Sequence, residues 1–398
     1  MKNNKRYFIL ISLVGALILV FIQRLYIGIM QDYLIEKLGL TLRQLSNLSS
    51  STLYGYAIMQ IPVGILVDKV GVRKVTIWGM ALTFLSSILF TYATSYTLAI
   101  VARFFIGVGT SVVVVSIMKV QALWFDKKDF SKLSSIVSFI GNLGMLLATV
   151  PLAYFISIFG EKNALIAIIV LTFMVLASVV LFVEDKNIEK EEQESRVFNS
   201  IKEVVLNKCT YPPLLIIMFF VSTMTSFTSI WGITYLVNEY SLSTIDASKY
   251  MSFLSLGFIL GAFLVGVMDK VFKGDYKKNL KLFTFIYLLL WVYVLIIKKG
   301  NVNLRILPII FILMGICIMF HLLAFTAVKD VNKLENSGVA TATINMSEFI
   351  GSGILNLAIA LLIDSNFSYS GSLFVIIIYS FISFISSLFI DKSNLDLE

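Results

Sequence analysis

The chain has 398 residues and a mean hydropathy of +0.90, and only 14% of its residues are charged. A water-soluble protein of this length could not bury so much apolar surface in one core, so that class is excluded. The formal net charge of +8 is not accompanied by any motif for binding RNA or DNA, so we expect no nucleic-acid partner.

Twelve mostly apolar runs follow one another along the chain, each near the length that a helix needs to cross a bilayer. They lie at about residues 7–30, 45–67, 75–93, 98–118, 133–159, 164–182, 213–237, 251–268, 282–297, 306–328, 339–363 and 371–390. Backbone groups in lipid must be satisfied internally, and the alternating pattern of a barrel is absent, so the runs predict transmembrane helices. The first run is too long for a signal peptide and has no small-residue cleavage site.

The basic residues predict the orientation of these helices. With a cytoplasmic N-terminus, the inner segments carry 22 Lys and Arg and the outer loops carry 7. Three more basic residues lie inside predicted helices: Arg24, Arg103 and Lys119. We therefore expect a multi-pass protein of the cell inner membrane with both termini in the cytoplasm, and much of the basic excess is explained by topology.

A polar interruption between the sixth and seventh runs divides the chain into two sets of six helices. The predicted segments are a first half at 1–183, a cytoplasmic linker at 184–212 and a second half at 213–398. A short amphipathic helix is expected in the linker near Ser200–Leu206. The motif "VDKVGVRK" after the second run has a degenerate copy, "MDKVFKGDYKK", after the eighth, and Asp68 and Asp269 are 201 residues apart. This repeat predicts two parallel six-helix halves, as in one large class of secondary transporters.

The stretch "GILVDKVGVRK" resembles the signature of the major facilitator superfamily between helices two and three. The matching residues are Gly64, Asp68, Gly71, Arg73 and Lys74. "RFFIGVGTS", from Arg103 to Ser111, is similar to the family's pattern in helix four. The resemblance implies an all-α fold of two pseudo-symmetric six-helix halves, transport by alternating access, and function as a monomer. It also implies that Asp68, Arg73 and Lys74 latch the halves on the cytoplasmic side, with Asp269 as the weaker second-half counterpart.

Ionisable residues inside a membrane are costly, so each is a candidate for function. Arg24 lies well inside helix one, where its fork of donors suits a carboxylate or a phosphate; the alternative is a structural pairing. Tyr26 is a lower-ranked neighbour. Lys119, near the cytoplasmic end of helix four, either extends to the interface or guides anions at the inner gate.

Three residues are candidates for proton coupling. Glu348 in helix eleven is the only acid deep in the membrane, and it either carries a proton or statically balances an arginine. His321 is the only histidine, and it either changes charge as a proton passes or is a packing residue. Arg103 belongs to the family motif and is either architectural or part of proton handling.

The predicted helix seven contains no charged residue but carries several hydroxyl groups. Ser222, Thr225, Ser226 and Ser229 follow a spacing that places them on one helical face. With Trp231 and Tyr235 they form a candidate wall of a substrate site; the alternative is bonding to helix carbonyls or helix packing.

These features predict a secondary transporter for a small carboxylate-bearing solute such as an organic acid, a sugar acid or an amino acid. The expected mode is proton-coupled uptake. The alternatives are drug or metabolite efflux by proton antiport, or a membrane sensor that does not transport. We expect no enzyme activity and no cofactor, because a phosphate-binding loop is absent and one histidine with Cys209 and Cys317 gives no metal spacing or disulfide framework.

Overall fold

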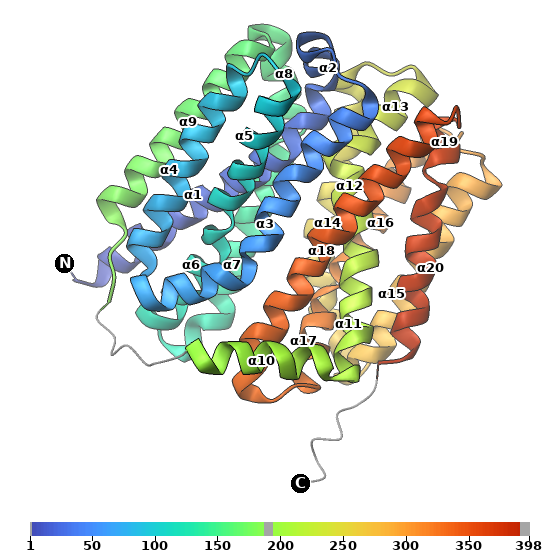
Figure 1. Cartoon of the computed structure of the whole chain (residues 1–398). Coiled ribbons are helices and arrows are strands. Elements are labelled where there is room, and N and C mark those ends of the chain that lie inside the picture. Colours follow the sequence, from blue (N-terminus) through green and yellow to red (C-terminus); the bar gives the residue numbers. More distant parts are fainter. Residues whose placement is uncertain (1, 187–193, 391–398) are drawn as a thin grey trace. The chain divides into compact units, whose positions relative to one another are not determined.

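The computed structural model describes residues 2–186 and 194–390 (Figure 1). The residues that it describes form helices and connecting turns without any strand. They divide into two compact units, 1–192 and 193–398, and the division falls inside the predicted linker at 184–212. Each unit is described by itself below.

Unit 1 contains the first six candidate membrane spans. Its helices are α1 (Lys2–Ile29), α2 (Gln31–Leu38), α3 (Leu42–Val70), α4 (Val72–Thr91), α5 (Tyr96–Thr110), α6 (Val112–Trp124), α7 (Lys127–Leu147), α8 (Val150–Phe159) and α9 (Glu161–Phe182). Two spans each consist of two helical segments. The span Tyr96–Trp124 contains α5 and α6, and the span Phe139–Phe159 contains the end of α7 and α8. The predicted runs and the six spans coincide, with differences only at helix ends.

Unit 2 contains the other six spans, preceded by the linker helix α10. Its helices are α10 (Glu194–Leu206), α11 (Tyr211–Ile216), α12 (Ser222–Ser226), α13 (Gly232–Tyr240), α14 (Thr244–Val271), α15 (Tyr276–Val292), α16 (Leu307–Met319), α17 (Leu322–Asp330), α18 (Ser337–Asp364), α19 (Tyr369–Ser372) and α20 (Phe374–Leu388). Short π-helical turns at Ile217–Val221 and Phe227–Trp231 join α11, α12 and α13 into one span, Lys208–Tyr240. The twelve predicted transmembrane helices are therefore confirmed.

The outer faces of several spans are apolar and largely exposed. On α9, Phe173, Met174 and Leu181 are 54%, 59% and 71% exposed. On α14, Phe263 and Val267 are 66% and 55% exposed. Such faces are unfavourable in water and are typical of helices solvated by lipid chains.

Glycines bring two helices into close contact in each unit. In unit 1, a Cβ at Gly107 of α5 would lie 2.0 Å from the carbonyl oxygen of Thr52, and one at Gly55 of α3 would lie 2.2 Å from that of Phe104. In unit 2, a Cβ at Gly257 of α14 would lie 2.1 Å from the carbonyl oxygen of Ile312. Small residues allow membrane helices to pack backbone against backbone.

The glycine contacts follow the internal repeat. A Cβ at Gly315 of α16 would lie 2.2 Å from the carbonyl oxygen of Leu254 of α14, so the α14–α16 pair is built like the α3–α5 pair. Gly55 and Gly257 are 202 residues apart, close to the 201 that separate Asp68 from Asp269. The repeat is therefore visible twice: each unit contains a copy of the motif, and each contains the same kind of glycine-mediated helix contact.

The linker helix α10 is held against the turn between α17 and α18. Glu203 accepts a hydrogen bond from Asn336 Nδ2 at 2.8 Å and lies 3.3 Å from Lys333 Nζ. Just after the helix, Asn207 Nδ2 donates to the carbonyl oxygen of Val331 at 2.6 Å. The bond from Asn336, with that from Lys333, holds the pKa of the Glu203 carboxyl below its usual range. The stability that the ionised Glu203 carboxylate contributes is therefore present at neutral pH and is lost as the pH falls through this lowered pKa.

Candidate functional site

Arg24 lies inside α1 with a half-buried side chain. Its guanidinium carbon is 4.3 Å from the centre of the Tyr56 ring on α3, and 6.0 Å from that of Phe21. A cation over an aromatic face is held by the charge distribution of the ring. This contact fixes the orientation of a planar donor group that can bind a carboxylate through two hydrogen bonds. Tyr56 was not identified from the sequence, because only the packing of α3 on α1 brings it there.

Arg103 and Tyr26 lie together in the interior of unit 1. Arg103 is fully buried on α5, and its Nη1 donates to the carbonyl oxygen of Gln23 on α1 at 2.7 Å. Its Nε donates to the carbonyl oxygen of Leu48 on α3 at 3.4 Å, and its guanidinium carbon is 5.1 Å from the centre of the Tyr26 ring. One side chain thus joins three helices, as the architectural alternative requires. Roles of Tyr26 in substrate binding and of Arg103 in proton coupling stay predictions.

The structure brings Lys119 to the acid of the signature motif. Lys119 Nζ lies 2.7 Å from Asp68 Oδ1, and both side chains are partly exposed. The pair connects the C-terminal ends of α3 and α6, so a candidate substrate residue and a candidate gating residue form one ion pair. Lys74 is exposed at the start of α4, and a Cβ at Gly64 would meet no atom within 4 Å.

The other half of the signature turn is held by Asp185, just after α9. The backbone N–H of Arg73 donates to Asp185 Oδ1 at 2.9 Å, and Arg73 Nη2 donates to the carbonyl oxygen of Val180 at 3.1 Å. The carboxylate thereby occupies the N-terminal end of α4, where helix N–H groups lack intrahelical partners. Gly71 has φ +99°, and a Cβ there would lie 2.6 Å from Asp185 Oδ2. The motif needs glycine both for its backbone angle and for the space that the carboxylate fills.

In the second copy of the motif, the turn is capped by a residue of the turn itself. Asp269 is half-buried near the end of α14, and Gly274 supplies the positive φ of +75°. Asp275 itself caps α15, because its side chain accepts a hydrogen bond from the backbone N–H of Lys278 at 3.2 Å. The capping acid thus comes from the turn in unit 2 and from a distant segment in unit 1.

Glu348, half-buried on α18, is contacted by the hydroxyl face of helix seven. Thr225 Oγ1 donates to Glu348 Oε1 at 2.9 Å, and Ser222 Oγ donates to the Glu348 carbonyl oxygen at 2.8 Å. The close approach depends on Gly351, where a Cβ would lie 2.1 Å from the carbonyl oxygen of Met218. The Glu348 carboxyl is therefore positioned by a polar side chain from a neighbouring helix.

The other candidates of helix seven lie inside unit 2. Ser226 Oγ donates to the Ser352 carbonyl oxygen at 3.1 Å, and Trp231 Nε1 donates to Asn356 Oδ1 at 3.0 Å. Tyr235 is 1% exposed, and its hydroxyl donates to the carbonyl oxygen of Gly300. These contacts match the helix-packing alternative. A substrate role for Ser226, Trp231 and Tyr235 stays a prediction.

His321 marks an interruption of helix ten. It lies between α16 and α17, is 8% exposed, and its Nδ1 is 2.8 Å from the carbonyl oxygen of Ile318. Its ring stacks on Phe258 of α14 with centres 5.9 Å apart. The structure thus places the histidine ring beside aromatic side chains. Glu348 and Thr225 lie on other helices, α18 and α12. Within residues 2–186 and 194–390, no group of three His, Cys, Asp or Glu residues could hold a metal ion.

A comparison with known sequences identifies relatives of this arrangement. The family model for the Major Facilitator Superfamily matches residues 12–301. "Uncharacterized transporter YybO" of Bacillus subtilis is 26% identical over 166 residues, which are 42% of this chain and 38% of that protein. "Probable sulfoacetate transporter SauU" of Cupriavidus necator is 36% identical over 94 residues, 22% of this chain and 21% of that protein. "Probable anion transporter 3, chloroplastic" of Arabidopsis thaliana is 34% identical over 121 residues, 29% of this chain and 24% of that protein. Each match thus spans well under half of the relative's length.

Solved structures share the whole fold at low sequence identity. A bacterial homologue of the human lysosomal transporter Spinster has a TM-score of 0.75 at 14% identity, with 97% of this chain and 98% of that chain covered. The D-xylose-proton symporter has a TM-score of 0.75 at 13% identity, with 96% and 97% covered. Likeness at this level of identity is evidence for the fold alone.

Proposed function

Because this chain belongs to the major facilitator superfamily and is a multi-pass membrane transporter, we propose that it carries a small carboxylate-bearing solute by proton-coupled uptake. The membrane is the cell inner membrane, and both termini are cytoplasmic. The two six-helix halves alternate in access to a site near the bilayer midplane. An organic acid, a sugar acid or an amino acid fits this proposal.

The observation that carries the proposal is the placement of Arg24. A permanently charged guanidinium within the apolar span Lys5–Ile29 is costly, and here it is stacked on Tyr56. Its planar donors suit the two oxygens of a carboxylate better than a neutral sugar or a cation. The names of two relatives, which mention sulfoacetate and anions, support the same class of solute.

We expect Arg24→Ala to lower uptake of the carboxylate in proteoliposomes strongly, through weaker binding of the solute. The loss of a charge-assisted bidentate contact lowers the affinity by roughly 10- to 100-fold, and Arg24→Lys restores only part of it because an ammonium lacks the fork geometry. A thermal-shift screen of organic acids, sugar acids, amino acids and lipophilic cations on purified protein identifies the solute first. Radiolabelled uptake of that solute then measures the effect.

Arg305→Ala is the matched control, because this arginine is exposed between the ninth and tenth spans. It removes the same charge and should leave uptake unchanged. If only lipophilic cations stabilise the wild type, the uptake proposal is wrong and the result favours drug or metabolite efflux. A wild type that binds no solute and moves none would favour a sensor.

Proton coupling is assigned to Glu348 because it is held in the membrane by Thr225 at hydrogen-bond distance. Glutamine at this position keeps the size and accepts the same hydrogen bond, but it cannot carry a proton. We expect Glu348→Gln to lose accumulation driven by an imposed pH gradient and to keep exchange of labelled for unlabelled solute. Unchanged accumulation would contradict this role, and loss of both activities would make Glu348 a structural or substrate-binding residue.

A further inference from the structure

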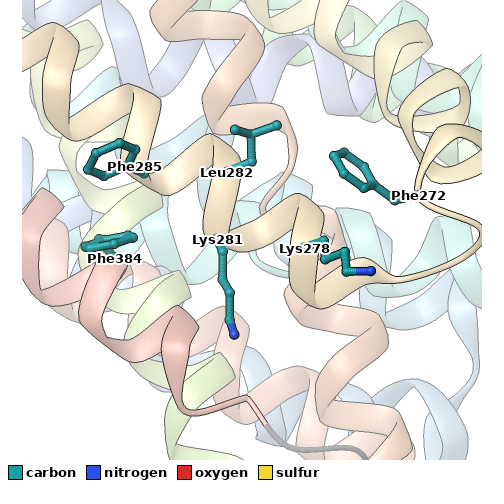
Figure 2. Close-up of a pocket in the computed structure, with 6 residues that line it drawn as sticks. All are labelled: Phe272, Lys278, Lys281, Leu282, Phe285 and Phe384. Atoms are coloured by element: carbon teal, nitrogen blue, oxygen red, sulfur yellow. The ribbon is translucent and has the colours of Figure 1, made fainter.

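A shallow groove opens at the cytoplasmic end of unit 2, and its lining includes none of the candidate site residues. It is lined by four apolar residues and two lysines, namely Phe272, Leu282, Phe285, Phe384, Lys278 and Lys281 (Figure 2). Phe285 of α15 and Phe384 of α20 lie against each other with ring centres 5.1 Å apart. In Figure 2 these rings lie at one end of the groove, Phe272 at the other, and the Lys281 ammonium points away from the apolar residues.

The groove is built partly from the degenerate second copy of the signature motif. The stretch from 270 to 281, KVFKGDYKKNLK, contains five lysines and one acid. Asp275 is engaged in the turn, where it caps α15 and lies 3.4 Å from Lys278 Nζ. Among residues 2–186 and 194–390, the structure gives the Lys281 ammonium no hydrogen-bond or ion-pair partner. The groove therefore has an excess of positive charge at its polar edge.

The apolar side of the groove continues into the lipid-facing surface of the same helices. Phe285 and Leu289 on α15 are 41% and 48% exposed, and Phe381 and Leu388 on α20 are 52% and 44% exposed. An occupant must therefore be apolar toward the membrane interior and negatively charged at the cytoplasmic edge. Juxtamembrane lysine clusters attract anionic lipids of the cytoplasmic leaflet in this way.

We propose that the groove between α15 and α20 binds an anionic glycerophospholipid of the cytoplasmic leaflet. The phosphodiester lies between the ammonium groups of Lys278 and Lys281. One acyl chain packs on Leu282, Phe285 and Phe384. The lipid thereby bridges two helices of unit 2 that are already neighbours, and it fastens the cytoplasmic end of the unit to the membrane surface.

The test compares lipids on the full-length protein purified in detergent. Phosphatidylglycerol, phosphatidylcholine with the same acyl chains, and glycerol 3-phosphate are titrated separately, and binding is measured by native mass spectrometry and by thermal shift. A lysine close to an anionic surface contributes about fivefold to affinity, so Lys278→Ala with Lys281→Ala should weaken phosphatidylglycerol binding roughly 25-fold. Phosphatidylcholine binding should change little.

The double variant Lys298→Ala with Lys299→Ala is the matched control. It removes two adjacent lysines that are exposed at the opposite end of the same span, and it should bind phosphatidylglycerol like the wild type. Equal binding of phosphatidylglycerol and phosphatidylcholine to the wild type would overturn the proposal. So would full phosphatidylglycerol binding by the Lys278/Lys281 double variant, and binding of glycerol 3-phosphate as tight as that of the lipid would show a phosphate site instead.

Discussion

Arg103→Lys is expected to lower the stability of unit 1 by about 3 kcal/mol, because the charge stays buried while most of its partners are lost. The fully buried guanidinium reaches carbonyl oxygens of α1 and α3 at the same time, with its planar group near the Tyr26 ring. A single ammonium cannot span both carbonyls, and it remains desolvated. For a unit of this size, the apparent Tm in detergent should fall by roughly 6–12 °C.

Two further variants make the Arg103 prediction specific. Arg103→Met removes the charge together with its desolvation cost, so it should be more stable than Arg103→Lys although less stable than the wild type. Arg43→Lys is the matched control, because Arg43 is exposed at the start of α3, and its effect should stay within about 0.5 kcal/mol. If Arg103→Lys keeps the wild-type Tm and loses only proton-driven accumulation, the residue acts in proton handling and the architectural interpretation is wrong.

Twelve helices and the family could be predicted from the sequence because both depend on local signals. A run of apolar residues needs no knowledge of its neighbours to be recognised as a membrane span, and the Gly71 turn is written within a few residues. The repeat of Asp68 at Asp269 also reports on organisation without any contact information. These signals fix element type and order.

The partners of the candidate residues could not be predicted, because they depend on how helices face one another. Asp185 is 112 residues from Arg73 along the chain, and only the packing of α9 beside α4 brings it to the signature turn. Spacing placed Ser222 and Thr225 on one face of helix seven but did not say that the face lies against α18. The π-helical turns at Ile217–Val221 and Phe227–Trp231 change the register of that helix in a way that a regular 3.6-residue period does not describe.

Gly257→Ala and Gly266→Ala are expected to change stability in opposite directions, although both lie on α14 and add the same methyl group. At Gly257 the new Cβ would lie 2.1 Å from a backbone oxygen of α16, so the helices must separate, at a cost of about 1–3 kcal/mol. At Gly266 no atom lies within 4 Å, so alanine should instead stabilise by about 0.5–1 kcal/mol through its higher helix propensity. Apparent Tm values of the two variants in detergent measure both effects.

The internal repeat extends this prediction to unit 1 with its own matched control. Gly55→Ala should destabilise α3 against α5, where a Cβ would lie 2.2 Å from the Phe104 carbonyl oxygen, whereas Gly64→Ala meets open space on the same helix. Both glycines lie 202 residues before their counterparts in unit 2, so the four variants form two pairs that should behave alike. A Gly55 variant as stable as the Gly64 variant would show that the α3–α5 contact yields without cost. The glycines act through backbone contact alone. A loss of stability in both units would therefore show that the same glycine-mediated contact stabilises helix packing within each of the repeated halves.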